Sequence, residues 1–251
     1  MVGSAVLLWE GLGVLLSLDG LSKSFGSLKV TDDITLDVPE GQALGVLGPN
    51  GAGKTTLFNL ISGDLLPDRG GVLFQGENVT RLLPHQRCRK GIGRTYQIPH
   101  PFIGMTVFEN LLVAATHGAA LHEHEAYSVC VDVLERTGLK KRANALAGSL
   151  TLLDRKRLEL ARALATRPKL LLLDEIAGGL TDHEALALVD LINEIRASGI
   201  SLIWIEHVVH ALLKVADRLM VIDFGAMLAE GEPQAVMDNP EVRRVYMGIE
   251  V

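Results

Sequence analysis

The stretch Gly48-Pro49-Asn50-Gly51-Ala52-Gly53-Lys54-Thr55-Thr56 decides the fold of this chain. It has the Walker A pattern G-x-x-x-x-G-K-T, in which glycines let successive backbone N–H groups point at one anion. Lys54 supplies a mobile positive charge for phosphate groups, and the Thr55 hydroxyl is a candidate ligand of Mg²⁺. An apolar run before the stretch predicts a buried strand, and the amphipathic pattern after it predicts a helix. The sequence therefore predicts a nucleoside triphosphate site in which all nine residues take part.

The composition of the whole chain narrows the class of protein. Its 251 residues suit one large domain, and a formal net charge of −6 gives no basic field that would attract nucleic acid. Cys88 and Cys130 lie far apart in the sequence, as expected of reduced thiols. The apolar N-terminal residues lack a basic start and a small-residue cleavage pattern. We therefore expect residues 1–13 to be an extension and residues 14–251 to form the domain.

The pattern of apolar residues predicts an α/β fold. Buried strands that alternate with amphipathic helices are typical of a mostly parallel sheet with flanking helices, as in P-loop NTPases. The stretches Val14 to Leu21 and Val30 to Val38 instead indicate an N-terminal antiparallel β part. From about residue 98 to residue 150 the periodicity becomes helical. We expect this segment to be a helical subdomain inserted into the α/β core.

Two carboxylates follow the most apolar strand of the sequence. Leu170 to Leu173 predict a strand buried on both faces, and Asp174 and Glu175 come directly after these leucines. Ligands bind at the C-terminal edge of parallel strands. Asp174 is therefore a candidate Mg²⁺ ligand, acting through water opposite Thr55. Glu175 is the candidate general base that polarises a water for attack on the γ-phosphate.

Two more polar side chains follow predicted strands. Gln97 ends a strand, so its amide can complete the Mg²⁺ shell or position the attacking water. His207 follows the buried run Ile200 to Ile205 and can contact the γ-phosphate. A single histidine or strand-end acid is often structural. Because these candidates end strands of one sheet, we expect Gln97, Glu175 and His207 to be catalytic.

The order of these motifs resembles the ATP-binding subunits of ABC transporters over about residues 14 to 249. Within that family, several stretches are similar to subunits of importers of branched-chain or other hydrophobic amino acids and of urea. These stretches are G-R-T-Y-Q at residues 93–97, M-T-V-F-E-N-L-L-V-A at 105–114, R-L-E-L-A-R-A-L at 157–164 and N-P-E-V-R-R-V-Y-M-G at 239–248. The resemblance implies an ATPase with ATP and Mg²⁺ as cofactors, whose two subunits sandwich two ATP molecules.

The resemblance also assigns roles and partners. It implies that Phe25 stacks on adenine, although the sequence alone allows a core position equally well. Asp182 would belong to the loop that crosses the dimer interface, and Gln97 would couple the site to the membrane. The implied partners are a second ABC ATPase subunit, two transmembrane permease subunits and, indirectly, a periplasmic or extracellular binding protein. The implied location is the cytoplasmic face of the plasma membrane.

The sequence departs from the family pattern at the signature, where one subunit meets the partner's ATP. The family usually has L-S-G-G-Q, whereas this chain has Leu150-Thr151-Leu152-Leu153-Asp154. Two leucines stand in place of glycines that let the backbone approach a phosphate. We therefore expect a heterodimer in which the partner supplies an unaltered signature. The alternative is a small shift of the loop that lets Thr151 still reach the phosphate. A second departure is Ile176, which stands after Glu175 where the family usually has a proline.

Two other functions remain as alternatives. A soluble ABC ATPase could act on nucleic acid or the ribosome, but a single acidic domain without a charged arm disfavours this, and we expect no nucleic-acid partner. A regulatory ABC subunit that hydrolyses ATP poorly is the second alternative, which the altered signature suggests.

Overall fold

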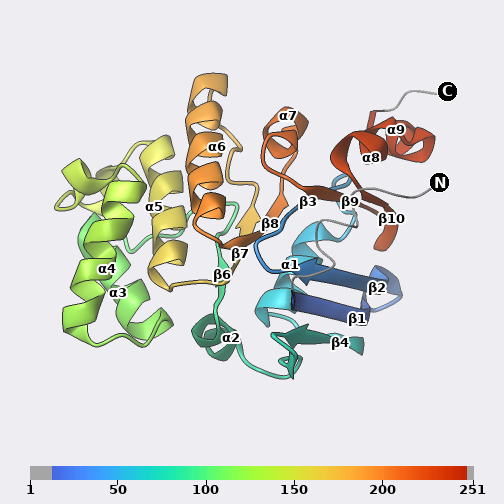
Figure 1. Ribbon diagram of the computed structural model, residues 1–251, viewed down its shortest axis with the longest axis horizontal. Coiled ribbons are helices and arrows are strands. Elements are labelled where there is room, and N and C mark those ends of the chain that lie inside the picture. The colour runs from blue at the N-terminus through green and yellow to red at the C-terminus, as the bar shows by residue number, and fades with distance from the viewer. Residues whose placement is uncertain (1–12, 248–251) are drawn as a thin grey trace.

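The computed structural model describes residues 13–247, whose strands form two sheets (Figure 1). The larger sheet has the strand order β10 (Ala226–Gly231), β9 (Arg218–Asp223), β3 (Ala43–Leu47), β8 (Ser201–Ile205), β7 (Leu170–Asp174) and β6 (Ile92–Arg94). The smaller sheet has the order β2 (Leu28–Pro39), β1 (Val14–Phe25), β4 (Arg69–Phe74) and β5 (Glu77–Asn78). The α-helices are α1 (Lys54–Ser62), α2 (Pro84–Lys90), α3 (Val107–Val113), α4 (Glu123–Arg136), α5 (Leu152–Ala165), α6 (Asp182–Ala197), α7 (Val209–Leu213), α8 (Pro233–Asp238) and α9 (Pro240–Met247).

Parallel pairing in the larger sheet brings the functional strand ends together. Strand β3 pairs in parallel with β8 and β9, and β7 pairs in parallel with β6 and β8. Only β10 is antiparallel to its neighbour among the described strands of this sheet. The C-terminal ends of β3, β8, β7 and β6 therefore lie at one edge, which confirms the α/β fold class expected from the sequence.

The leucines of β7 connect two hydrophobic cores. Leu171 and Leu173 pack in a cluster with residues of α5 and α6, whereas Leu170 and Leu172 pack in a cluster with residues of α1 and the smaller sheet. Successive side chains of a strand point to opposite faces, so one strand serves both clusters. Burial of each leucine contributes about 1.5–3 kcal/mol. The strand that ends at Asp174 is thus held on both faces.

The segment between β6 and α5 is rich in helices. It contains α3, a π-helical segment at Ala114–Gly118, α4 and two short 3₁₀ turns at Lys140–Arg142 and Ala147–Ser149. An isolated antiparallel β-bridge between Thr106 and Leu146 joins the beginning of this segment to its end. Within residues 13–247, no helix has both the length and the apolar character needed to cross a membrane.

Several element boundaries differ from those expected. Strand β1 continues to Phe25, past the expected end at Leu21. The sequence pattern does not indicate α7 and α8, because helices of five and six residues are too short to show a clear period.

The basic run Pro84 to Lys90 predicts a short helix with an exposed basic face. Helix α2 spans these residues, but its basic face is not fully solvated. Arg87 is buried and donates to the backbone oxygens of Thr80, Leu60 and Ile61 at 2.7 to 2.8 Å. Leu60 and Ile61 lie in the last turn of α1, where carbonyls lack helical partners. Burial lowers the pKa of Arg87 to about 10. The expectation of an exposed basic face is therefore wrong for this arginine, which caps the helix that follows the glycine-rich loop.

Candidate active site

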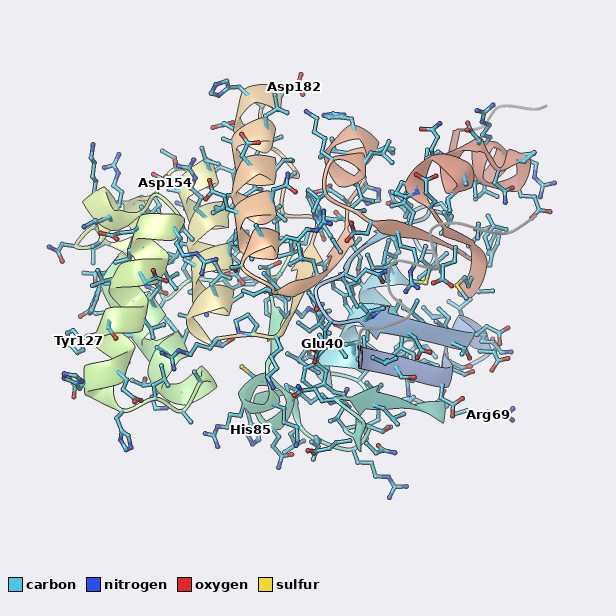
Figure 2. All side chains as sticks on the ribbon, viewed as in Figure 1. Glu40, Arg69, His85, Tyr127, Asp154 and Asp182 are labelled. Atoms are coloured by element: carbon cyan, nitrogen blue, oxygen red, sulfur yellow. The ribbon has the colours of Figure 1, made fainter. Side chains whose placement is uncertain are left out.

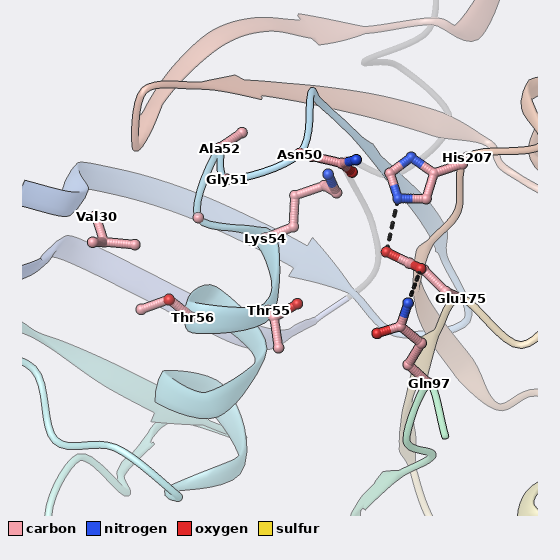
Figure 3. Close-up of a pocket in the computed structure, with 11 residues that line it drawn as sticks. Val30, Asn50, Gly51, Ala52, Lys54, Thr55, Thr56, Gln97, Glu175 and His207 are labelled. Carbon is pink, nitrogen blue, oxygen red and sulfur yellow. Dashed lines mark hydrogen bonds and ion pairs between the residues drawn. The ribbon is translucent and has the colours of Figure 1, made fainter. Parts of the chain in front are cut away.

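A cleft of about 580 Å³ opens at the edge where the parallel strands end (Figure 3). The glycine-rich loop and the start of α1 form one wall, and residues that follow β6, β7 and β8 form the other. The lining residues are Val30, Asn50, Gly51, Ala52, Gly53, Lys54, Thr55, Thr56, Gln97, Glu175 and His207. The structure thus brings together most of the residues that the sequence predicted for one site.

Two glycines of the loop lie where no side chain fits. At Gly53 (φ 102°) a Cβ would lie 2.1 Å from the backbone oxygen of Val30, and at Gly48 (φ 155°) it would lie 2.3 Å from that of Ile222. Gly53 is also the residue at the N-terminus of α1. The loop backbone can therefore press against β2 and β9 while the helix N-terminus faces the cleft, an arrangement that favours anions.

Lys54 is held inside its own loop. Its Nζ donates to the backbone oxygens of Gly48 and Pro49 at 2.7 and 2.9 Å. Burial lowers the pKa of Lys54, and the charges of Glu175 and Asp174 partly oppose this shift. The ammonium group is thus confined to the cleft wall, within reach of any anion bound by the loop.

Glu175 lies between two polar side chains that come from different strands. Gln97 Nε2 donates to Oε2 of Glu175 at 2.5 Å, and His207 Nε2 lies 2.8 Å from Oε1 (Figure 3). Gln97 follows β6, Glu175 follows β7 and His207 follows β8. Both carboxylate oxygens therefore have a fixed direction at the cleft surface.

Asp174 lies below the cleft surface and is paired with an arginine. Arg94 Nη2 lies 3.4 Å from Asp174 Oδ2, and Arg94 Nη1 also contacts Asn59 and Asp64 at 2.6 and 3.1 Å. Burial raises the pKa of Asp174, and the charge of Arg94 acts in the opposite direction. Arg94 thus ties the end of β7 to α1 and the residues that follow it.

Phe25 is not among the side chains that line the cleft. Phe25 ends β1 with about half of its surface exposed, and Lys23 Nζ lies 5.8 Å from the centre of its ring. Val30 of the neighbouring strand lines the cleft. An interior core position is excluded for Phe25 by its exposure, and stacking on adenine stays a prediction.

The altered signature and Asp182 also lie outside the cleft lining. Asp154 and Asp182 lie at the same end of α5 and α6 in Figure 2. Thr151 is the N-cap of α5, and its Oγ1 accepts from the Asp154 backbone N–H at 3.2 Å. Leu150 is buried, whereas Leu152 is exposed. A Cβ on Gly179, three residues before Asp182, would lie 3.4 Å from a methyl group of Leu152.

Sequence reasoning missed two residues of this region. Val30 gave no signal, because a strand valine that lines a cleft looks like any other strand valine. Arg94 precedes Gln97 by three residues, at the end of a short strand paired with β7. A charged residue at the end of a predicted strand was the available signal, but only the assembled fold places this strand beside Asp174.

Comparisons with known proteins agree with this geometry. Residues 31–178 match the family described as "ABC transporter", and residues 226–251 match "Branched-chain amino acid ATP-binding cassette transporter". The chain is 37% identical to BraF of Pseudomonas aeruginosa and 36% identical to LivG of Escherichia coli. Each alignment covers 93% of this chain and 98% of the relative, and both relatives are described as high-affinity branched-chain amino acid transport ATP-binding proteins.

A solved structure gives the same result for the fold. The ADP conformation of MJ1267, an ATP-binding cassette of an ABC transporter, superposes with a TM-score of 0.86 at 32% identity. The superposition covers 94% of this chain and all of the other. The chain therefore belongs to the ABC transporter ATP-binding family and is the ATPase subunit of a membrane transporter.

Proposed function

We propose that this ATPase subunit drives a transporter that imports branched-chain amino acids. The observation that carries the hydrolytic role is the position of Glu175, oriented by Gln97 and His207 at a cleft that contains the glycine-rich loop. The substrate class rests on BraF and LivG, which are described as branched-chain amino acid transport proteins, and on the family matched by residues 226–251.

The nine loop residues would hold the phosphates of ATP. Backbone N–H groups and the N-terminus of α1 favour the negative charge, and Lys54 would exchange its loop carbonyls for phosphate oxygens. Phe25 would stack on the adenine ring from the end of β1.

The donor set around the cleft suits Mg²⁺. Thr55 and Gln97 line the cleft and offer a hydroxyl and an amide oxygen, and Asp174 offers a buried carboxylate at the end of β7. Hard oxygen ligands of this kind are those that Mg²⁺ prefers. The ion would neutralise charge on the phosphates when bound.

Glu175 would act as the general base. Its carboxylate takes a proton from water while the water oxygen attacks the γ-phosphorus, and ADP leaves with the electrons of the broken P–O bond. Gln97 and His207 hold the two carboxylate oxygens in place. His207 would also contact the γ-phosphate.

The Glu175→Gln variant tests this role together with the substrate. We expect near-normal ATP affinity, a fall in kcat of at least about 100-fold because an amide is not a base, and loss of leucine uptake by vesicles that carry the complete transporter. Glu135→Gln is the matched control, since Glu135 is exposed on α4. ATPase activity within a few-fold of the unaltered protein would exclude Glu175 as the base. ATP hydrolysis by the unaltered transporter without leucine uptake would instead exclude the proposed substrate.

Membrane subunits would dock on the face formed by Gln97 to Leu112, which is rich in apolar and aromatic residues. Ile98 and Ile103 are 67% and 69% exposed, and Phe102 is nearly half exposed with the guanidinium of Arg162 at 5.3 Å from its ring. Exposed apolar side chains that cluster beside a functional residue are typical of an interaction surface. Phe108 differs, because it packs against the core and lies 5.3 Å from the ring of Tyr127. The protein would thus lie on the cytoplasmic face of the membrane.

Cross-linking from this face tests the docking surface. In a Cys88→Ala background, Ile98→Cys and Ile103→Cys are expected to form cross-links to a permease subunit, because these side chains would lie within the interface. Val131→Cys on the exposed side of α4 is the control and is expected to form none. If Val131→Cys forms cross-links to the permease and Ile98→Cys and Ile103→Cys do not, the proposed docking surface is wrong.

The altered signature supports pairing with a different ATPase subunit. Thr151 already uses its hydroxyl oxygen to cap α5, and exposed Leu152 stands where a glycine would leave room for the partner's phosphate. Donors that are displaced lose much of their electrostatic effect. In a heterodimer, the cleft of this chain would meet an unaltered signature, whereas the partner's ATP would meet the leucines.

The ATPase rate of the isolated chain tests this asymmetry. We expect slow, non-cooperative hydrolysis by the chain alone and at least about tenfold faster hydrolysis after addition of the companion ATPase subunit from the same transporter. The double change Leu152→Gly with Leu153→Gly should raise the rate of the chain alone. Full-rate cooperative hydrolysis by a homodimer would contradict the proposal. A slow rate even with the companion would favour a regulatory role.

A further inference from the structure

Glu175 has a backbone conformation that a glutamate rarely adopts. Its φ is 45°, in the left-handed region, where a side chain other than that of glycine costs of order 1–3 kcal/mol. The Glu175 backbone N–H donates to Ile205 O at 2.9 Å, and the Gly178 N–H donates to Glu175 O at 3.2 Å. This turn sets the direction of the side chain that faces Gln97 and His207. Other groups must hold it in place.

One such group is Lys156, which comes from a different part of the chain. Lys156 lies on α5 and is only 4% exposed, and its Nζ donates to Gln97 O at 2.8 Å and to Glu175 O at 3.2 Å. A buried ammonium is costly unless it is paired, so these two carbonyls and nearby carboxylates must compensate it. Burial lowers the pKa of Lys156, and the charges of Glu206 and Glu175 oppose that shift most strongly.

Glu206 holds the other side of the same turn. It is 1% exposed, and its Oε1 accepts from the Ala177 N–H at 2.8 Å while its Oε2 accepts from the His207 N–H at 2.9 Å. Ala177 lies two residues after Glu175. Buried Lys156 therefore binds the backbone oxygen of Glu175, and buried Glu206 binds the backbone N–H of Ala177 in the same turn.

We propose that Lys156 is a positioning residue that couples the signature helix α5 to the general base of its own subunit. The inference rests on the proposed role of Glu175. Lys156 follows Thr151 by five residues, or roughly 7.5 Å along the helix at 1.5 Å per residue. A shift of α5 when its N-terminus meets the partner's ATP would therefore pull on the carbonyls of both Gln97 and Glu175. Binding of the partner's ATP at the N-terminus of α5 would thus change the position of Glu175 in this subunit through Lys156.

The coupling predicts an effect on turnover rather than on ATP binding. Lys156 donates to the backbone oxygens of Gln97 and Glu175, whereas the loop of residues 48–56 binds the phosphates. Misplacement of a reacting group by about 1 Å can cost roughly 100-fold in rate. Removal of the Lys156 donors should therefore lower kcat while the ATP dissociation constant changes little.

The test compares Lys156→Met, Lys156→Gln and Lys156→Arg in the complete transporter. We expect kcat to fall by at least about tenfold in Lys156→Met, with ATP affinity kept within about threefold. Lys156→Arg should recover much of the rate, because its guanidinium can donate to both carbonyls. Lys169→Met, at an exposed lysine directly before β7, is the control and should leave kcat unchanged. If Lys156→Met does not fold, Lys156→Gln provides the same comparison, since it lacks the charge.

A double-variant cycle separates this inference from the role of Glu175 itself. If Lys156 acts through Glu175, then Lys156→Met should slow single-turnover hydrolysis little further in a Glu175→Gln background. Independent, multiplicative losses would overturn the coupling, as would an unchanged kcat in both Lys156→Met and Lys156→Gln. If Glu175→Gln alone leaves hydrolysis near normal, the proposed base is wrong, whatever Lys156 does.

Discussion

The parallel pairing of β3, β8, β7 and β6 is the constraint on which the rest of the structure depends. Because these strands are buried on both faces, polar side chains are excluded from their interiors and occur where the strands end. Parallel pairing then places those ends at one edge. The glycine-rich loop, Gln97, Glu175 and His207 meet in one cleft for this reason, although they are spread over about 160 residues of sequence.

The sequence was informative wherever one local rule determined the structure. The glycine-rich loop between an apolar run and an amphipathic run predicted β3, α1 and the anion-binding site together. Four leucines followed by Asp174 and Glu175 predicted both the buried strand β7 and the edge at which Glu175 lies. The roles assigned to Asp174, Phe25 and Asp182 go beyond placement and remain predictions. The extension expected at residues 1–13 lies, except for residue 13, outside the described residues.

Contacts between distant parts of the chain could not be predicted in this way. The sequence indicated an exposed basic face on α2, but Arg87 turns inward to the carbonyls at the end of α1. Nothing local indicates that Arg94 pairs with Asp174 or that Lys156 reaches the backbone of Gln97 and Glu175. In each case a buried cation satisfies groups from other elements, which only the assembled fold brings within reach.

The placement of Lys54 connects the fold to the function most directly. Its ammonium group is buried in the loop, where it donates to two backbone oxygens. It can therefore exchange these oxygens for those of a bound phosphate with little movement. Calorimetric titration of the Lys54→Ala variant with ATP, with Lys169→Ala as the control, measures that contribution. Loss of charge-assisted hydrogen bonds should weaken ATP binding by at least about tenfold, with the control unchanged. Unchanged affinity in Lys54→Ala would contradict the assignment of this loop as the ATP site.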